Sequence, residues 1–380
     1  MTDAISDNYR KEQLRIRDFV VKEINPLAGK IDQEQSIPEG CIEKLSSEGY
    51  LGYTITLEYG GQSKDMVSLG ILSEETGRAC TSVRSLITVQ EMVSQSILKW
   101  GDENQKNKWL PGLAAGKLLG AFALTEPSIG SDAAGILTDF RDNDNSIIIN
   151  GKKKWISFGQ IADLFLLFGK QNNQATAIVL EKDTPGLSIS PIKDLLGVRG
   201  SMLAELTLDN CHVPKENIIG KPGMGTNPIA FNALQTGRFS IAFGCVGMAK
   251  TCFETAVRYS NSRNQFGKLL KDHQLIQGLL ADMLVKLKAS ESLCQKTSIL
   301  INSEDPKSFK EVLIAKYYAS KAASDIARDA VQILGAIGCS TIYPVERFFR
   351  DTKIMEVIEG SNQLIQTILS KYGYNEINNF

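Results

Sequence analysis

Apolar positions divide the chain into three stretches with different periodicities. In the first stretch, Leu14, Ile16, Phe19, Val20 and Ile24 recur at near-helical spacing. Further apolar segments lie at Ile42–Glu48, Asp65–Cys80, Val83–Trp100 and Glu103–Ala114, each bounded by glycine, proline or capping residues. This pattern predicts a helical domain over residues 1–119.

The second stretch, residues 120–227, is made of short segments rich in β-branched and aromatic residues and separated by turn formers. The segments are Ser146–Lys152, Ala162–Gly169, Ala175–Glu181, Leu187–Ile192 and Ala204–Val213. Such runs are typical of strands. Asn150-Gly151 is a tight-turn signal, and with the even spacing it predicts a small antiparallel β-barrel or sandwich.

The third stretch, residues 228–380, returns to helical spacing, with long segments near 229–261, 273–302, 307–336, 344–350 and 361–371. Within the second of these, Ile276, Leu279, Leu280, Met283 and Leu287 form one apolar stripe. The chain is therefore expected to be α+β and mainly α, with a β domain between two helical ones.

The composition of the chain excludes several classes of partner and site. Lys+Arg 42 against Asp+Glu 43 gives a net charge of −1, which argues against nucleic acid or a membrane surface as a partner. The start of the chain lacks the charged and apolar regions of a targeting segment, and no run of about 18 apolar residues occurs, so a cytoplasmic location is expected. Seven scattered cysteines and two histidines favour neither a disulfide framework nor a metal site. Redox or acid–base chemistry here needs an organic cofactor and a carboxylate.

Glu359 is the candidate carboxylate. Its neighbours Val357, Ile358 and Gly360 allow a dry pocket, where burial disfavours the charged form and raises the pKa above the free value of about 4.3. A carboxylate with a raised pKa is a useful general base. The alternative is a Glu at a helix start, stabilised by the helix dipole.

Two segments of the β domain carry candidate donors. The hydroxyl-rich run Leu124–Asp132 could present N–H and O–H groups to a heteroaromatic ring or a phosphate, although a plain turn has the same composition. Strand alternation would put Trp155 and Ser157 on one face, as a stacking platform beside a hydrogen-bond donor. The alternative for Trp155 is a core position.

Two more segments lie in the C-terminal helices. Arg263-Asn264-Gln265-Phe266-Gly267 ends a long helix and supplies a guanidinium that can hold a phosphate, or simply stabilise the helix dipole. Gln332–Gly338 offers small residues late in a helix, which suit close backbone approach, a helix contact or a C-cap. Gly223-Met224-Gly225 has no third glycine and no βαβ unit around it, so we expect no Rossmann domain.

These motifs, in this order, resemble those of the acyl-CoA dehydrogenase family over nearly the whole chain. The matching segments are Leu124–Asp132, Trp155–Ser157, Arg263–Gly267 and Asp351–Gln363, with Gly197–Gly200 and Val213-Pro214 in further agreement. The resemblance implies a helical bundle, a β barrel and a C-terminal four-helix bundle, divided at residues 1–119, 120–227 and 228–380. It also implies FAD and a homodimer or homotetramer.

Carried over to this chain, the resemblance gives each motif a role. Thr125 and Ser131 would bind the isoalloxazine and pyrophosphate region, Trp155 would pack on the ring, and Ser157 would lie near N5. The diphosphate and adenosine would be held, largely across a subunit interface, by Arg263, Gln265, Phe266, Gln332 and Gly335. Ser361 and Gln363 would complete the pocket beyond Glu359.

The resemblance implies that Glu359 removes an α-proton from an acyl thioester while hydride passes from Cβ to flavin N5. Some relatives place the base just before the arginine that corresponds to Arg238, where this chain has Gly237. The substrate would be an acyl-CoA or an acyl carrier protein thioester, and the oxidant an electron-transfer flavoprotein or another acceptor.

The run Cys80–Val89 resembles the dehydrogenases of polyketide and nonribosomal peptide pathways, which oxidise short polar acyl groups on acyl carrier proteins. Arg84 could then recognise a polar acyl substituent, with Arg238 as a second substrate contact. The alternative for Arg84 is a surface ion pair. Two other functions stay open: an oxygen-reducing acyl oxidase on the same scaffold, and a helical protein that binds carrier proteins without chemistry.

Overall fold

The computed structural model describes residues 7–377 of the 380-residue chain. The α-helices of its first part are α1 (Asp7–Phe19), α2 (Ala28–Glu34), α3 (Glu39–Ser47), α4 (Met66–Ala79), α5 (Thr81–Trp100) and α6 (Glu103–Ala114). Residues 1–6, on which the expectation of no targeting segment partly rests, lie outside the described range. Among the described helices, none is both long enough and apolar enough to span a membrane.

A mixed sheet follows the first helices. Its strands are β1 (Gly120–Ala123), β2 (Asp139–Asn143), β3 (Ser146–Ile156), β4 (Leu164–Gln171), β5 (Gln174–Glu181), β6 (Leu187–Pro191), β7 (Ala204–Pro214) and β8 (Ile218–Ile219). They are ordered β6-β7-β3-β2-β4-β5-β8, with β1 also paired to β4. Alternate residues of β4 face opposite ways: Leu164, Leu166 and Phe168 pack toward the helices, whereas Phe165 and Leu167 enter the core of the sheet.

Two details of the predicted β domain need correction. β1 and β2 both run parallel to β4, and the two ends of the sheet do not pair with each other, so the domain is neither purely antiparallel nor a closed barrel. Asn150-Gly151 does not form a turn, because both residues lie inside β3, where the register with β7 shifts between Ile149 and Gly151. The glycine there accommodates a bulge in the strand.

The C-terminal part begins with α7 (Phe231–Ser262) and a hairpin of β9 (Asn264–Gln265) and β10 (Lys268–Leu269). It continues with α8 (Gln274–Asn302), α9 (Ser308–Leu334), α10 (Val345–Val357) and α11 (Asn362–Ile377). α9 packs against α7, α8 and α10, and α7 packs against α8 and α10, so the expected four-helix bundle is present. α10 extends to Val357, beyond the predicted end at residue 350.

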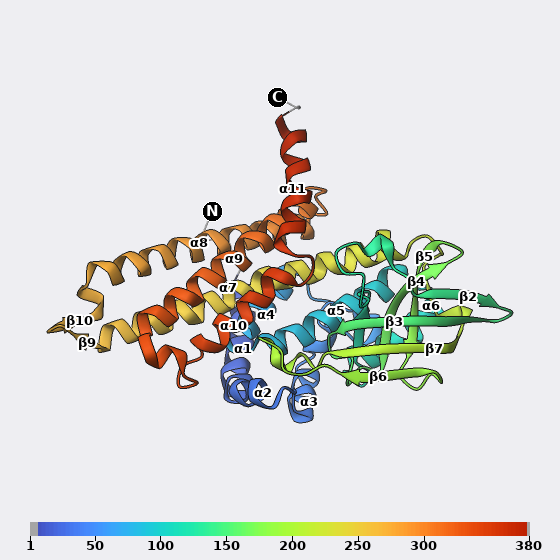
Figure 1. Cartoon of the computed structure of the whole chain (residues 1–380), viewed down its shortest axis with the longest axis horizontal. Coiled ribbons are helices and arrows are strands. Elements are labelled where there is room, and N and C mark those ends of the chain that lie inside the picture. The colour runs from blue at the N-terminus through green and yellow to red at the C-terminus, as the bar shows by residue number, and fades with distance from the viewer. Residues whose placement is uncertain (1–6, 378–380) are drawn as a thin grey trace.

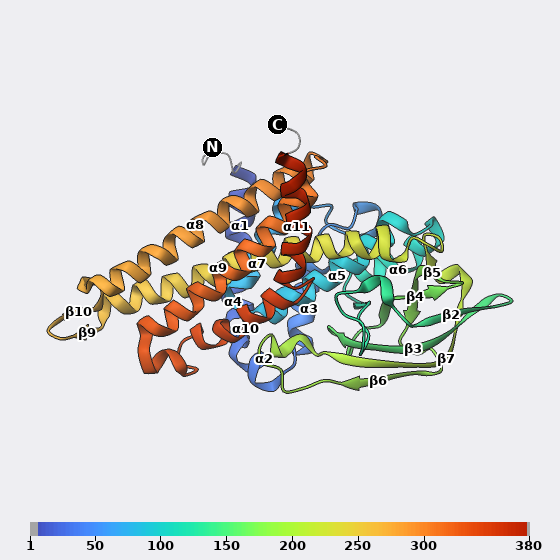
Figure 2. The same cartoon turned by 45° about the horizontal axis from the view of Figure 1, so that its top comes forward.

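α7 joins the two helical parts, because it packs against α4 and α5 of the first and against α8, α9 and α10 of the last. Figures 1 and 2 show the sheet at one end of the molecule and the β9–β10 hairpin at the other, and Figure 1 shows α11 projecting from the bundle. Gly247 lets α7 approach α4 closely, because a Cβ there would stand 2.1 Å from the main-chain oxygen of Glu74. The predicted fold class, α+β and mainly α, is confirmed.

Candidate active site

Glu359 lies in a short linker between α10 and α11, which we call the Glu359 linker (residues 358–361). Its φ is +55° and that of Gly360 is +87°, so two successive residues adopt the left-handed conformation. This conformation is natural for glycine but uncommon for glutamate, and such strain gathers at functional sites. Glu359 precedes α11, which starts at Asn362, so the helix-dipole interpretation does not describe it.

Gly237 of α7 faces the carboxyl group of Glu359. A Cβ on Gly237 would stand 2.7 Å from Glu359 Cδ and 2.8 Å from Oε2. A side chain at position 237 would therefore occupy the space in which this carboxyl group lies.

The carboxyl group is sealed from water at one oxygen. Oε2 is buried and has no hydrogen-bond partner among the described residues, although the residue as a whole is half-buried. Burial raises the pKa of Glu359 to about 7, against the lowering effect of the positive charges of Arg238, Lys316 and Arg84. A carboxylate with a pKa near neutrality and an unsatisfied oxygen is suited to accept a proton.

Arg238 contacts the backbone of this linker rather than its carboxylate. Its Nε donates to the main-chain oxygen of Glu359 at 2.9 Å, and its Nη1 donates to Gln235 Oε1 at 3.0 Å. Burial lowers the pKa of Arg238. Arg238 thereby ties the backbone of Glu359 to α7.

Arg84 is 1% exposed, so the surface ion pair considered from the sequence is wrong. Its Nη1 donates to Thr88 Oγ1 at 3.1 Å and its Nη2 to Ser85 Oγ at 2.7 Å, while the buried Nε has no partner among the described residues. Burial lowers the pKa of Arg84 to about 10. Gly244 makes room for it, since a Cβ there would stand 2.5 Å from Arg84 Cδ. A buried guanidinium with only neutral hydrogen-bond partners can receive a polar or anionic group.

The hydroxyl-rich loop, residues 124–132, is anchored by a buried ion pair that the sequence analysis missed. Lys153 Nζ lies 2.8 Å from Glu126 Oε1 and donates to the main-chain oxygen of Leu124 at 3.1 Å. Glu126 also accepts hydrogen bonds from the main-chain N–H groups of Leu137 and Thr138. Two sequence features could have indicated this pair: a glutamate inside the segment 124–132 and a lysine at an inward-facing position of β3. The pair fixes the loop that carries Thr125, which is half-buried, and Ser131, which is exposed.

Trp155 has φ +61° and is 52% exposed, so it is not the core residue that the alternative proposed. The β3–β7 register shifts between Lys153 and Ile156, and β3 ends at Ile156, before Ser157. The alternation that put Trp155 and Ser157 on one strand face therefore does not hold. The main-chain N–H of Lys154 donates to Thr125 O at 2.9 Å, which places the end of β3 beside the hydroxyl-rich loop.

The remaining predicted cofactor residues lie elsewhere. Arg263, Gln265 and Phe266 are exposed at the β9–β10 hairpin, with Phe266 94% exposed. Gln332 and Gly335 are exposed where α9 ends, toward the same end of the bundle (Figures 1 and 2). One chain does not bring these residues to Thr125 and Trp155, which lie in the β domain. Ser361 lies two residues after Glu359, its Oγ accepts from the N–H of Leu364 at 3.3 Å, and Gln363 is exposed.

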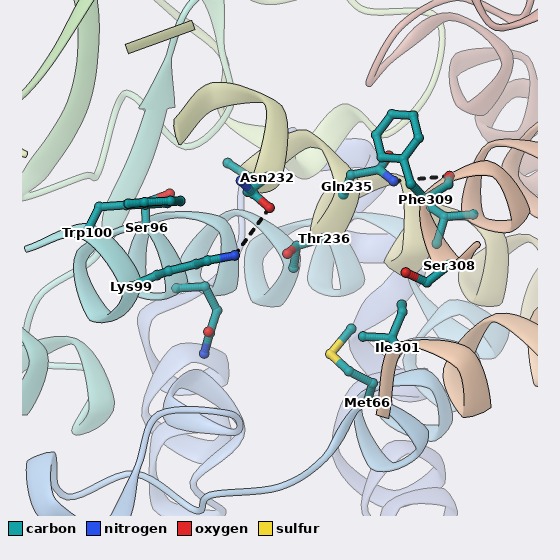
Figure 3. A pocket seen from close by; sticks show the side chains of 13 residues that line it. Met66, Ser96, Lys99, Trp100, Asn232, Gln235, Thr236, Ile301, Ser308 and Phe309 are labelled. Carbon is teal, nitrogen blue, oxygen red and sulfur yellow. Dashed lines mark hydrogen bonds between the residues drawn. The ribbon is translucent and has the colours of Figure 1, made fainter. Parts of the chain in front are cut away.

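A cavity of about 370 Å³ lies between the end of α5, the start of α7 and the α8–α9 connection. Figure 3 shows Lys99 pointing toward Asn232 and Gln235 toward Phe309 across it. Gln235 also accepts a hydrogen bond from Arg238, so the Arg238 side chain connects this cavity wall to the Glu359 linker.

The residues present fit a flavin. The observations that support the fit are an exposed aromatic ring held at positive φ, an anchored loop of donors beside it, and an orphaned buried carboxylate oxygen. Among residues 7–377, no group of three or more His, Cys, Asp or Glu side chains is arranged to hold a metal ion.

Comparison with known proteins identifies the family. The N-terminal, middle and C-terminal domains of acyl-CoA dehydrogenase match residues 6–117, 121–211 and 224–372, respectively. An acyl-CoA dehydrogenase of Bacillus subtilis is 38% identical over 94% of this chain and 95% of its own length. A glutaryl-CoA dehydrogenase of Desulfococcus multivorans is 36% identical over 96% of both. The chain therefore belongs to the acyl-CoA dehydrogenase family, whose members are FAD-dependent oxidoreductases acting on CH–CH groups.

Solved structures agree with this assignment. Butyryl-CoA dehydrogenase from Megasphaera elsdenii superposes with a TM-score of 0.93 and 32% identity, over 98% of this chain and 99% of that one. A glutaryl-CoA dehydrogenase from Mycobacterium smegmatis in complex with FADH2 has a TM-score of 0.93 at 29% identity, over 97% and 95%. The prolyl acyl carrier protein oxidase AnaB has a TM-score of 0.93 at 27% identity, over 97% and 99%. The chain is thus similar to enzymes named for different acyl groups and carriers.

Proposed function

We propose that this protein is an acyl-thioester dehydrogenase in which Glu359 is the catalytic base. The observation that carries the proposal is the buried, unpartnered Oε2 of Glu359, whose pKa burial raises to about 7. Glu359 accepts the α-proton of the substrate at this oxygen. The flavin, when bound, supplies the acceptor for the hydride that leaves Cβ.

The same linker offers a donor for the thioester carbonyl. The main-chain N–H of Glu359 is not used in a backbone hydrogen bond within the described residues. A preorganised donor at this position would stabilise the charge that develops on the carbonyl oxygen as the α-proton leaves. Arg238 holds the Glu359 backbone, so it contributes to this geometry by position and is a weaker candidate for a direct substrate contact.

For the cofactor, we propose the roles that the resemblance assigns. Thr125, Ser131, Trp155 and Ser157 bind the isoalloxazine side, and Ser361 and Gln363 complete the pocket beside the base. Arg263, Gln265, Phe266, Gln332 and Gly335 hold the diphosphate and adenosine of the flavin in a neighbouring subunit, because they lie away from the β domain of their own chain. The protein is accordingly a homodimer or homotetramer. The domain boundaries at 119/120 and 227/228 and the cytoplasmic location stay predictions.

We propose further that the acyl group is short and carries a polar or negatively charged substituent that meets Arg84. The support is a guanidinium that is 1% exposed, with an unpartnered Nε and no ion pair among the described residues. A buried charge without a partner lowers the stability of the fold, so we expect a hydrogen-bond acceptor on the substrate to pair with the Arg84 guanidinium. The thioester carrier is coenzyme A or an acyl carrier protein, and the oxidant is an electron-transfer flavoprotein or another acceptor.

Anaerobic bleaching of the flavin absorption band tests the chemistry. Purified protein is mixed with a panel of acyl-CoA and acyl carrier protein thioesters, with and without a terminal carboxylate. Glu359→Gln should keep FAD yet fail to bleach it with any substrate that bleaches the wild type. Bleaching at the wild-type rate would remove Glu359 from the mechanism.

Two variants at position 84 test the acyl group. Arg84→Met should lose activity on polar substrates and retain activity on unsubstituted short acyl chains, whereas Arg84→Lys should keep part of the polar preference. An unchanged preference in Arg84→Met would overturn this assignment.

One alternative has specific support, because AnaB is named an oxidase. Slow reoxidation of the substrate-reduced protein by air, with rapid reoxidation by an electron-transfer flavoprotein, would exclude an oxidase. A binding protein without chemistry is disfavoured by the intact Glu359 and the flavin motifs, and a bleachable bound flavin would exclude it.

A further inference from the structure

Lys316 of α9 places an ammonium group directly behind the Glu359 linker. Its side chain is 0% exposed, and its Nζ donates to the main-chain oxygen of Gly360 at 3.0 Å and to Asn362 Oδ1 at 3.1 Å. Within the described residues it takes part in no ion pair. The cation is therefore held by two neutral oxygen atoms, both within three residues of Glu359.

A buried ammonium group such as that of Lys316 is unfavourable unless its surroundings compensate for the lost hydration. Burying an ammonium group removes its hydration, and only good geometry with further hydrogen bonds offsets that loss. Asn362 is itself 4% exposed, and its amide exchanges hydrogen bonds with Ser320 Oγ, one turn along α9 from Lys316. α9 thus presents a rigid pair of polar groups to the start of α11.

Two buried cations donate hydrogen bonds to successive main-chain carbonyl groups of the Glu359 linker. Arg238 donates to the main-chain oxygen of Glu359 and Lys316 to that of Gly360, from α7 and α9 respectively. These are the two residues with left-handed backbones, a conformation that persists only where the surroundings impose it. We propose that Lys316 is a positioning residue whose buried ammonium fixes the backbone of the Glu359 linker and adds to the positive charge that favours the ionised carboxylate of Glu359.

The charges that face Glu359 come from three helices: Arg84 from α5, Arg238 from α7 and Lys316 from α9. All three favour the ionised carboxylate, whereas burial opposes it. Arg238 touches only the backbone oxygen of Glu359, and in the proposed function Arg84 is engaged by the substrate. The positive charges of Arg238 and Lys316 therefore both act on the carboxylate throughout the reaction, with Arg238 the larger influence and Lys316 the second.

Lys316 also faces groups other than Glu359. Its pKa is lowered to about 8, chiefly by burial and to a smaller extent by the charge of Arg238, while Cys245, Glu359 and Glu356 act to raise it. Lys316 is consequently protonated below about pH 8, which includes the range in which Glu359, with a pKa of about 7, has to ionise.

Infrared titration of the folded, FAD-loaded protein tests this role without depending on turnover. The band of the protonated Glu359 carboxyl group is identified as the one missing from Glu359→Gln. In Lys316→Met the midpoint of this band should move upward by about one pH unit, as expected for loss of a nearby opposite charge. The acid limb of kcat/KM should move with it. Lys321→Met, on the exposed side of the same helix, is the matched control and should leave both midpoints unchanged.

Asn362→Asp provides a second variant that keeps the shape of the site, in case Lys316→Met does not fold. The new carboxylate would neutralise Lys316 in place, so the midpoint should again move upward. A purely structural Lys316 would instead change the melting temperature and leave the midpoint where it is. An unmoved midpoint in every variant that folds overturns the proposal.

The inference rests on Glu359 as the base, but the two can fail separately. If Glu359→Gln still bleaches flavin, the proposed function fails, whatever Lys316 does to the infrared midpoint. If Glu359→Gln is inactive and the midpoint does not respond to Lys316 or Asn362, only the role of Lys316 fails.

Discussion

A Cβ atom on Gly237 would stand 2.7 Å from the Cδ atom of Glu359, so α7 and the carboxyl group leave no room for a side chain between them. Relatives of the family that place their base at the position of Gly237 would therefore present it to the same space. In the proposed function, the two positions are alternative origins for one carboxylate, and in this chain Gly237 leaves the space that the Glu359 carboxyl group occupies.

Gly237→Ala should impair catalysis while the protein stays folded. The methyl group would displace only the end of the Glu359 side chain, which is cheap for folding, and alanine favours a helix over glycine by about 1 kcal/mol. A displacement of about 1 Å at a reacting group costs on the order of 10²-fold in rate. Stopped-flow bleaching measures the rate and thermal unfolding measures the stability. Gly278→Ala on α8 is the control, because nothing lies within 4 Å of its Cβ; equal bleaching rates in the two variants would contradict the steric argument.

The pH dependence of turnover should report the ionisation of Glu359. Only the deprotonated carboxylate accepts a proton, so kcat/KM should increase as pH rises through about 7, the value to which burial raises the pKa of Glu359. Measurements from pH 5 to pH 8 with one saturable substrate define this limb. A kcat/KM that is already near its plateau at pH 5, as the free glutamate pKa of about 4.3 would give, would show that the carboxyl group is not held in the dry site.

The same carboxyl group should make stability fall with pH. Its pKa is higher in the folded than in the unfolded protein, so its contribution is complete below about pH 4 and is lost as pH rises through about 7. Glu359→Gln cannot ionise and should unfold less readily than the wild type above pH 7, by up to about 3 kcal/mol, with the difference vanishing toward pH 4. Denaturant unfolding of both FAD-loaded proteins at several pH values measures this; a constant difference across pH would contradict it.

Helical segments were predictable because apolar residues at three- and four-residue spacing define one face of a helix wherever it packs. Strand directions were not, because a strand alternates in the same way whether its neighbour is parallel or antiparallel. β1 and β2 run parallel to β4 through connections that residue patterns do not encode. Asn150-Gly151 carried a genuine local preference, but pairing of β3 with β7 on both sides of it favoured a bulge over a turn.

For the site, the sequence identified Glu359 and its apolar neighbours but not the surroundings that tune it. Arg84 resembled any arginine on a helix face, and its burial depends on Gly244, which lies on a helix far along the chain. Lys316 carries no local signal, since a lysine becomes buried only when distant oxygens are brought to its Nζ. Partners contributed by tertiary packing cannot be inferred from spacing alone.

The Glu126–Lys153 pair should be needed for flavin retention. Lys153→Met would leave the buried Glu126 without its cation, a change that typically costs about 3–5 kcal/mol. The loop of residues 124–132 would loosen, so the purified variant should contain less FAD and unfold more readily. Lys215→Met is a control in the same domain, since Lys215 pairs with Asp142 at 3.0 Å on an exposed surface, where such pairs contribute about 0–1 kcal/mol. Normal FAD content in Lys153→Met would contradict the anchoring role.

The separation of Trp155 from Phe266 within one chain leads to a test of subunit sharing. If Arg263 and Phe266 serve the flavin of a neighbouring subunit, each site takes its base and β domain from one chain and its β9–β10 hairpin from another. Arg263→Ala removes a phosphate partner and should lower flavin occupancy, while Glu359→Gln should bind flavin without bleaching it. Each variant alone should have little activity.

A mixed oligomer of these two variants should recover activity, because one of its sites combines the intact Glu359 of one chain with the intact Arg263 of the other. Chains carrying different affinity tags allow the mixed species to be purified, and about half of the sites in a mixed dimer should bleach with substrate. Homo-oligomers of each variant, refolded in the same way, are the controls. If Arg263 acted on the flavin of its own chain, every site in the mixed dimer would lack either the base or the phosphate partner. Mixed oligomers no more active than the Arg263→Ala protein would therefore place the hairpin in its own subunit's site.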